Sequence, residues 1–333
     1  MIRVSACLIV RDESDRIAGC LASLQGLVDQ VVVHDTGSTD DTVALARAGG
    51  ARVVEGSWSD SFAAARNASL DAATGEWVLS LDADELVHAD VAGLRQWLDG
   101  VDDRALLVLI RNPVVDGGHG YEYTTVKLFR RWGARWVGRV HERVVHDGVP
   151  VQPLRLVPPE LLALDHRGYA AEGAAVRKGK RNLRLAALEL RDRLDDRPPS
   201  PEAIALAALN LGRSAIGAGD PQQAVDAFES VRETVTGGDV WNEATDHLAR
   251  VLLGAGEPAF GIVLAGQLQD VGVDPSYCSW LRAQGLAQSG DAVAALHELE
   301  GVTQIVDTAG RRHDPAALET LRGLCLELLG TST

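Results

Sequence analysis

The sequence has few cysteines and no long apolar run. These two features argue against a cysteine-based scaffold and against a membrane-spanning protein. Its four cysteines, Cys7, Cys20, Cys278 and Cys325, lie far apart and form no C-x-x-C pair. Zinc ribbons and disulfide scaffolds need closely spaced pairs, so buried free thiols are expected. No stretch approaches the roughly 20 apolar residues of a transmembrane helix, so no membrane span is expected.

The sequence also lacks a signal-peptide pattern and an excess of positive charge. Residues 1–4 lead directly into a strand-like run, without the charged region, apolar core and cleavage site of a signal peptide. We therefore expect a cytoplasmic protein. The formal net charge is −15 at pH 7, which disfavours general binding to nucleic acid, itself densely negative.

Three common enzyme motifs are missing. There is no glycine-rich dinucleotide fingerprint and no phosphate-binding P-loop, so NAD enzymes and P-loop ATPases are excluded. The segment 141–146 begins and ends with histidine, but these lie five residues apart. A zinc protease needs them four apart on one helical face, and Val144 and Val145 favour a strand.

What is present is an alternation of strands and helices over the first third of the chain. The length of 333 residues suggests two domains. The hydrophobic pattern predicts strands at 4–10, 31–33, 52–54 and 77–81, with helices at 17–27, 42–48 and 62–73 between them. Such alternation indicates a parallel sheet with right-handed crossovers. Further strands are predicted at 106–111, 125–129 and 139–145, a loop at 113–120, and a long basic helix at 174–194.

Polar clusters follow three of these strands, at 11–13, 35–40 and 82–85. Ligands of parallel sheets bind beyond the carboxyl ends of the strands, so the three clusters should converge on one rim. Within the third cluster, Asp82-Ala83-Asp84 places two carboxylates two residues apart at a strand end. Such a pair suits one Mg²⁺ or Mn²⁺ ion that also binds phosphate oxygens.

A second, helical domain is predicted after the proline-rich segment 198–201. Gly219-Asp220, Gly256-Glu257 and Gly290-Asp291 sit between helical patterns, 37 and 34 residues apart. A period near 34 fits helix-turn-helix repeats of the tetratricopeptide type. We therefore predict an α/β domain over 1–196 and an all-α repeat domain over 197–333.

Several motifs together resemble family 2 glycosyltransferases of the GT-A fold, a Rossmann-like nucleotide-diphospho-sugar transferase fold. More narrowly, the chain resembles the bacterial subgroup with tetratricopeptide repeats after the catalytic domain. That subgroup is similar to transferases that act on lipopolysaccharide core sugars or bacteriocin peptides. The matching stretches are 6–13, 33–40, 58–62, 65–67, 75–77 and 81–85, with weaker echoes at 140–142 and 165–169.

The resemblance implies a nucleotide site, residue by residue. Backbone contacts of Cys7, Leu8 and Val10 would form a floor under the base, and Glu13 would lie at the same rim. The residues expected to contact the ribose or base, or to shape their pocket, are Asp35, Asp60, Arg66 and Asn67.

The resemblance also implies a metal site and a reaction. In the Asp82-Ala83-Asp84 motif, Asp82 would face the ribose and the metal, and Asp84 would be the principal metal ligand. His166 would approach the diphosphate or the metal. Family members of this kind usually invert the anomeric centre, and Glu142 is the candidate base.

Each of these residues also has a purely structural interpretation, which the sequence leaves open. Asp35 could cap a helix or turn, and Asp60 could form an ion pair with Arg66. Glu142 could pair with Arg139 or Arg143. His166 could be a packing histidine, and Glu85 could either solvate the strand end or orient the metal-binding loop.

The sequence thus predicts a metal-dependent glycosyltransferase that uses Mn²⁺ or Mg²⁺ and a nucleotide sugar. The base is expected to be uracil by analogy, with thymine and guanine open. The acceptor is a peptide, a glycan or a small natural product. The repeats would bind a partner, self-associate or brace the catalytic domain. The alternative is a degenerate sugar-nucleotide sensor whose helical tail acts as an adaptor.

Overall fold

The computed structural model describes residues 2–112, 121–152, 154–167 and 174–330. Contacts divide them into two compact units, an α/β unit whose described residues end at 167 and a helical unit containing α5 to α12. The sequence predicted the boundary at 196/197. Helix α5 (Ala174–Asp195) packs against α6 (Pro201–Ala218), however, so the contacts group it with the helical unit.

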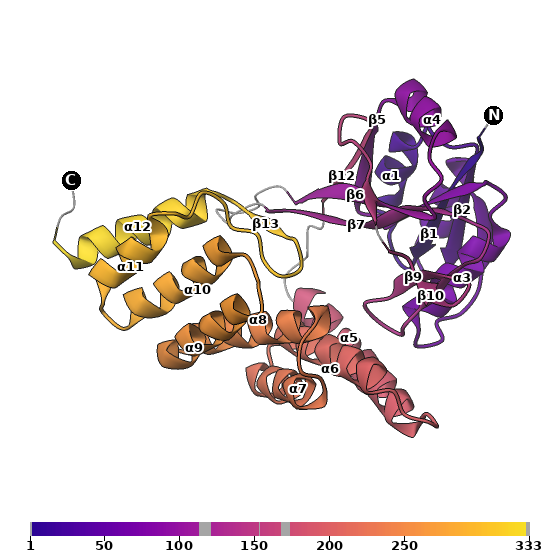
Figure 1. The fold of residues 1–333 in the computed structure, drawn as a ribbon. Helices are drawn as coiled ribbons and strands as arrows, with labels where there is room; N and C mark the ends of the chain where they lie inside the picture. Colours follow the sequence, from indigo (N-terminus) through magenta and orange to yellow (C-terminus); the bar gives the residue numbers. More distant parts are fainter. Residues whose placement is uncertain (1, 113–120, 153, 168–173, 331–333) are drawn as a thin grey trace. The chain divides into compact units, whose positions relative to one another are not determined.

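The α/β unit is built on a sheet with the strand order β3–β2–β1–β4–β7–β6–β12–β5 (Figure 1). Strand β1 pairs in parallel with β2 and β4, as the alternating pattern predicted, and β7 runs antiparallel to β4. The strands are β1 Val4–Val10, β2 Gln30–Asp35, β3 Arg52–Glu55, β4 Trp77–Leu81, β5 Glu85–Ala89, β6 Ala105–Asn112, β7 Tyr121–Arg130, β11 Arg155–Leu156 and β12 Leu162–His166.

Each face of this sheet has its own apolar cover. Helices α1 (Ile17–Ser23), α2 (Thr42–Ala48) and α4 (Val91–Asp99) contribute to one core, and α3 (Phe62–Ala72) contributes to the other. Side chains alternate along a strand, so Trp77, Leu79 and Leu81 of β4 join the first core. Val78 joins the second core. Ser80 therefore faces the α3 side, next to the carboxyl end of β4.

A separate three-stranded sheet lies on the α3 side. It consists of β8 (Ala134–Val137), β9 (Arg143–His146) and β10 (Val149–Pro150), and its Trp136 and Val144 enter the second core. The predicted strand at 139–145 was therefore too long. Its first half is an irregular bend in which His141 has φ +51, and only the β-branched pair Val144-Val145 and its neighbours form β9. The predicted loop at 113–120 lies outside the described residues.

The helical unit is a series of helices in which successive members pack side by side (Figure 1). The predicted breaks at 219, 256 and 290 are glycines with positive φ that end helices or the turns after them. Gly212 of α6 has no room for a side chain because Phe228 of α7 closes on it. The remaining helices are α7 Pro221–Thr234, α8 Asp239–Gly254, α9 Pro258–Asp270, α10 Pro275–Gln288, α11 Ala292–Leu299 and α12 Ala316–Leu328.

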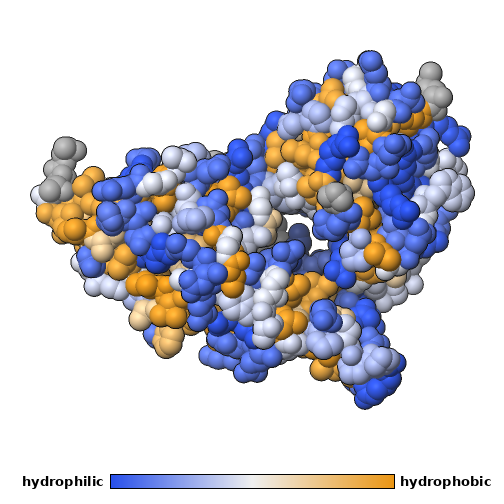
Figure 2. All heavy atoms as spheres, viewed as in Figure 1, coloured by the Kyte–Doolittle hydropathy of each residue, from blue (hydrophilic) through white to orange (hydrophobic). Residues whose placement is uncertain are grey.

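The surface of the helical unit carries apolar side chains on its later helices (Figure 2). Phe260 and Val263 on α9, Val293 on α11 and Leu328 on α12 are each more than half exposed. Even so, among the residues the structure describes, no helix is both long and apolar enough to span a bilayer.

Candidate active site

The acidic segment after β4 is a tight turn held by its own side chain. The backbone N–H of Asp82 donates to Glu85 Oε2 at 2.9 Å, and the Glu85 N–H donates to the Asp82 carbonyl at 3.1 Å. Glu85 is 1 % exposed and begins β5. Of the two roles the sequence left open for Glu85, the structure therefore shows the second, orientation of the loop that carries Asp82 and Asp84.

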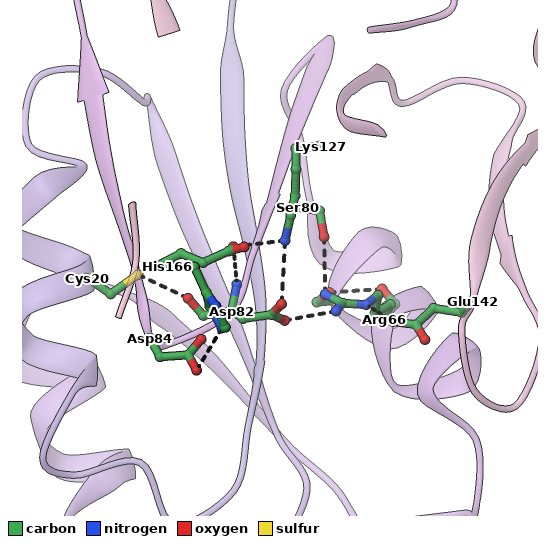
Figure 3. Close-up of polar contacts among 10 residues, drawn as sticks. Cys20, Arg66, Ser80, Asp82, Asp84, Lys127, Glu142 and His166 are labelled. Carbon is green, nitrogen blue, oxygen red and sulfur yellow. Dashed lines mark hydrogen bonds and ion pairs between the residues drawn. The ribbon is translucent and has the colours of Figure 1, made fainter. Parts of the chain in front are cut away.

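Two cationic side chains hold the Asp82 carboxylate (Figure 3). Arg66 on α3 donates to Oδ1 at 2.8 Å, and Lys127 on β7 lies 3.4 Å from Oδ2. Lys127 also contacts Glu85 at 2.8 Å. Desolvation opposes ionisation of Asp82, but Lys127 and Arg66 outweigh it and hold the Asp82 pKa well below its usual range. The Asp82 side chain nevertheless keeps 41 % of its surface exposed.

Asp84 faces a different partner, His166 at the end of β12. His166 Nε2 lies 3.2 Å from Asp84 Oδ2, and its Nδ1 lies 2.8 Å from Asn112 Oδ1. The hydrogen bond with Asp84 raises the His166 pKa. Asn112 Oδ1 and the Asp84 carboxylate both accept, so the two contacts are satisfied together when both ring nitrogens carry protons, and loss of the Nε2 proton would free that nitrogen for a cation. The packing-histidine interpretation is thus insufficient, because His166 is aimed at Asp84.

The donor atoms of Asp84 and His166 suit a shared divalent cation. Two ligands of one octahedral Mg²⁺ or Mn²⁺ ion lie about 3 Å apart, close to the separation seen here. No group of three or more His, Cys, Asp or Glu side chains surrounds a common point in the part of the chain that the structure describes. Asp82 points to Arg66 and Lys127 instead. Such a two-ligand site is typical of cations that take their remaining ligands from phosphate and water.

Glu142 lies on the other side of Arg66. Its Oε1 accepts from Arg66 Nε at 2.6 Å, and its side chain is 12 % exposed. From the sequence, Arg139 or Arg143 was the expected structural partner of Glu142, and in the structure Arg66 is a partner. Arg66 thus binds Asp82 and Glu142 at once and also donates to Ser80 at 3.2 Å. Burial opposes the charge on Arg66, but the two carboxylates more than compensate and raise its pKa.

A pocket of about 430 Å³ adjoins Arg66 and Glu142 on the α3 side of the sheet. Arg66, Ser80 and Lys127 are among the residues that line it, together with Glu142 and Trp136. The guanidinium of Arg66 also lies 5.1 Å from the centre of the Trp136 ring. The pocket therefore joins the residue proposed as a base to the residues that hold Asp82.

At the rim formed by β1 and β2, the structure supports some of the predicted contacts. Glu13 lies close enough to Asp82 and Asp84 for their charges to affect it, and burial is the main cause of its raised pKa. Asp35 accepts from the backbone N–H groups of Gly37 and Ser38, at 3.0 Å each. It is therefore a turn residue, as its structural interpretation held, and its contact with a nucleotide stays a prediction.

The three residues predicted to lie under the base are all hydrogen-bonded within or beside the sheet. Cys7 and Leu8 pair with both β2 and β4, so the sheet uses their backbone hydrogen-bonding groups. Val10 pairs with β2 alone, beyond the end of the β4 pairing. The Val10 carbonyl accepts from both the N–H and the hydroxyl of Thr36, at 3.0 and 3.1 Å. Contact of Cys7, Leu8 and Val10 with a base therefore stays a prediction.

The two residues expected to shape the nucleotide pocket from the α3 side have structural contacts. Asp60 has φ +57 and accepts from the indole N–H of Trp58 at 3.0 Å. Asn67 bonds to both the N–H and the carbonyl of Trp136, at 2.9 Å each, and so fixes β8 to α3. Their roles toward a nucleotide stay predictions.

Three site residues were absent from the sequence analysis or without a firm role there: Lys127, Glu85 and Asn112. Lys127 carried a signal, since it is one of only three lysines and interrupts the apolar run Val126–Phe129 of a predicted strand. A charge within such a run indicates a buried partner. Asn112 carried none, because its role depends on the pairing of β12 with β6.

The chain is similar to known glycosyltransferases over its first half. The model of "Glycosyl transferase family 2" matches residues 5–145. A TPR repeat-containing protein of Synechococcus elongatus is 47 % identical over 110 residues, 33 % of this chain and 27 % of that protein. The SPbeta prophage-derived glycosyltransferase SunS of Bacillus subtilis is 28 % identical over 193 residues, 56 % of this chain and 45 % of that protein.

A solved structure is also similar. The glucosyl-3-phosphoglycerate synthase of Mycobacterium tuberculosis, in complex with Mn²⁺, UDP and glucosyl-3-phosphoglycerate, is 29 % identical and covers 35 % of this chain and 45 % of that one, with a TM-score of 0.28. The chain spans less than half the length of the two curated relatives described above. By the family match, residues 5–145 are a family 2 glycosyltransferase domain, and the stacked helices α5 to α12 follow it in the chain.

Proposed function

We propose that the protein transfers a sugar from a nucleotide-diphosphate sugar to an acceptor, with a divalent cation held by Asp84 and His166. The observation that carries this proposal is the Asp84–His166 pair at 3.2 Å, set close in the chain to an Asp82 carboxylate that the protein's own cations already neutralise. The family match of residues 5–145 supports the reaction class. The base of the nucleotide is proposed to be uracil, by analogy.

The cation, Mn²⁺ or Mg²⁺, would neutralise the diphosphate that leaves when the bond to the sugar breaks. Asp84 and His166 would supply two of its ligands. Asp82 would accept a hydrogen bond from the ribose, since its carboxylate oxygens are held at their inner side and remain partly exposed. Val10 and Asp35 lie at the rim where the base would bind.

Glu142 is proposed to take the proton of the attacking acceptor hydroxyl in an inverting reaction. Its Oε1 accepts from Arg66, and a carboxylate has a second oxygen that can receive a proton. The neighbouring pocket of about 430 Å³ is the proposed acceptor site. Its size suits a sugar or a single side chain of a larger acceptor, so peptide, glycan and small natural product acceptors all remain within the proposal.

The alternative is a degenerate domain that senses a sugar nucleotide and acts through its helical tail. Degenerate copies usually lose the metal-binding carboxylates. Here Asp84 is intact and aligned with His166, which favours the enzyme. The helical unit would then bind an acceptor or a partner protein, or associate with a second copy.

The test is a thermal-shift and calorimetric titration of UDP, GDP and dTDP, each with and without Mn²⁺. A ligand that binds the native state at about 100 times its Kd stabilises it by about 2.7 kcal/mol, a measurable shift in melting temperature. A Mn²⁺-dependent shift with one nucleotide supports the donor site and names the base. No shift with any of the three contradicts the proposal.

A further inference from the structure

Lys127 is a buried cation that neither the sequence motifs nor the family match assigns to the site. It lies on β7 just before Leu128, which pairs with Leu79 of β4. Its side chain is 9 % exposed, and its ammonium contacts Glu85 at 2.8 Å and Asp82 at 3.4 Å. Burial opposes the charge on Lys127, but Asp82 and Glu85 outweigh it and raise its pKa.

Stability alone is a poor account of this arrangement. Two charges moved out of water lose their hydration, and a buried ion pair is often no better than an apolar pair of similar volume. The Lys127–Glu85 contact is almost completely buried, with the Glu85 side chain 2 % exposed. Its geometric effect is clear, however, because the same Glu85 oxygen accepts the N–H of Asp82 and so closes the acidic turn.

Lys127 and Arg66 hold the two oxygens of Asp82 from different elements. Arg66 binds Oδ1 from α3, and Lys127 approaches Oδ2 from β7 (Figure 3). A carboxylate held at both oxygens cannot rotate about its Cβ–Cγ bond without losing these contacts. It also cannot swing toward a cation at Asp84 without leaving one of its partners.

We propose that Lys127 is a positioning residue of the donor site: with Glu85 it fixes the acidic turn, and with Arg66 it fixes the Asp82 carboxylate toward the ribose and away from the metal. This inference rests on the proposed function, since it concerns how the donor and its cation are received. It assigns Lys127 no contact with the donor. The effect of Lys127 on the donor therefore passes through Asp82.

The experiment distinguishes positioning of Asp82 by Lys127 from a role in which Lys127 only neutralises the buried Glu85 carboxylate. Lys127→Met alone leaves Glu85 buried and unpaired, which can unfold the domain. The double variant Glu85→Gln/Lys127→Met removes both charges, and the amide oxygen of the introduced glutamine can still accept the Asp82 N–H. Binding of UDP in the presence of Mn²⁺ is measured by calorimetry, and melting temperature is measured on the same samples without ligand.

We expect the double variant to melt close to the wild type yet to bind UDP·Mn²⁺ about tenfold more weakly, the loss typical of one hydrogen bond to a charged group. Lys127→Arg, which keeps the charge, should retain most of the affinity. Arg95→Met is the matched control for lost stability: Arg95 binds the Ile2 and Leu27 carbonyls and Asp29, away from the site. It should lower the melting temperature and leave UDP·Mn²⁺ affinity unchanged.

A thermodynamic cycle with Asp82→Asn tests whether Lys127 affects nucleotide binding through Asp82. If Lys127 acts through Asp82, the double substitution costs no further affinity once Asp82 is replaced. Wild-type affinity in the double variant would overturn the proposal, because Lys127 would then only neutralise Glu85. Fully additive losses would also overturn it, because Lys127 would act on the donor directly. If the wild type itself binds neither nucleotide nor Mn²⁺, the proposed function is contradicted, and this inference is contradicted with it. The outcomes above contradict the inference alone.

Discussion

Each unit of the protein contains a network of ion pairs and hydrogen bonds around one aspartate. The two networks differ in whether that aspartate is completely buried, which we call closed, or partly exposed to solvent. In the helical unit, Asp246 of α8 is 1 % exposed by its side chain and accepts from Tyr277 at 2.6 Å and Thr308 at 2.7 Å. Arg250 lies 3.2 Å from it. In the α/β unit, Asp82 is also held by two partners, Arg66 and Lys127, yet its side chain is 41 % exposed.

This difference in exposure distinguishes a network that only stabilises the fold from one that can also bind a ligand. Asp246 uses its hydrogen-bonding capacity on α10 and on the segment after α11, so it joins elements of the helical unit. Asp82 is held at both oxygens by Arg66 and Lys127 but stays partly exposed, and these two partners line a pocket. Buried polar groups that are fully satisfied define a fold, whereas those with open capacity can receive a ligand.

Among substitutions that test this comparison, Asp84→Ala is expected to cause the largest loss of transfer activity. Loss of the cation removes several kcal/mol of charge stabilisation from the leaving diphosphate, so transfer should fall by about 10⁴-fold. The melting temperature without ligand should stay near that of the wild type, because the side-chain bond that closes the acidic turn comes from Glu85. The measurement is nucleotide release from the sugar nucleotide chosen by the binding screen, over a range of Mn²⁺ concentrations. Full activity in this variant would remove Asp84 from the metal site.

The next effect concerns Glu142→Gln, which keeps the shape of the side chain but removes the base. Transfer should slow by about 10²- to 10⁴-fold, the usual contribution of a positioned base. The affinity for UDP·Mn²⁺ should stay within a few fold, since the amide oxygen of the introduced glutamine can still accept from Arg66. Calorimetry and rate measurements on one preparation distinguish the two effects. A collapse of nucleotide affinity at an intact melting temperature would make Glu142 a binding residue.

The closed network should respond in the opposite way. Asp246→Ala leaves Arg250 and the Tyr277 hydroxyl without their partner, so the helical unit should lose about 3 kcal/mol of unfolding free energy. The nucleotide and Mn²⁺ affinity of the protein should not change. Urea denaturation followed by circular dichroism measures the first quantity, and calorimetry the second. Weakened nucleotide binding at temperatures where the variant is folded would show that the two networks are not independent.

The smallest expected effect is a pH dependence in the helical unit. Burial, together with Arg250, lowers the pKa of His247 to about 3. Because the unfolded state binds this proton at a pH near 6.5, the stabilisation is present above that pH and is lost as the pH falls toward 3. Between pH 7 and pH 5 the loss should be about 1–2 kcal/mol. His247→Gln, compared with the wild type by urea denaturation at both pH values, should show a smaller change. Equal changes in the two proteins would contradict the assignment.

The sequence was most informative where a local pattern determines structure. Short apolar runs predicted β1 to β4, and the glycines at 219, 256 and 290 marked the breaks between helices, because both signals depend on near neighbours. The convergence of Asp82, Asp84 and Glu13 followed from the geometry of parallel strands. Strands β5 and β12 were missed, since their pairing joins residues far apart in the chain, such as Val87 and Leu164.

Side-chain partners were the least predictable part of the site. Arg66, Lys127 and Glu142 come from α3, β7 and the turn before β9, so no spacing in the sequence relates them. The charge of Lys127 within an apolar run could have indicated only that some buried carboxylate faces it. Which carboxylate depended on the antiparallel register of β7 with β4.

One guanidinium, that of Arg66, is shared by a carboxylate on the proposed donor side and a carboxylate on the proposed acceptor side. Anyone who re-engineers the acceptor preference by replacing Glu142 therefore also changes the charge that restrains Asp82. Substitutions at these three positions should not combine additively, so libraries that vary them one at a time will misjudge the best combinations. They are better randomised together, as a single functional unit of the sequence.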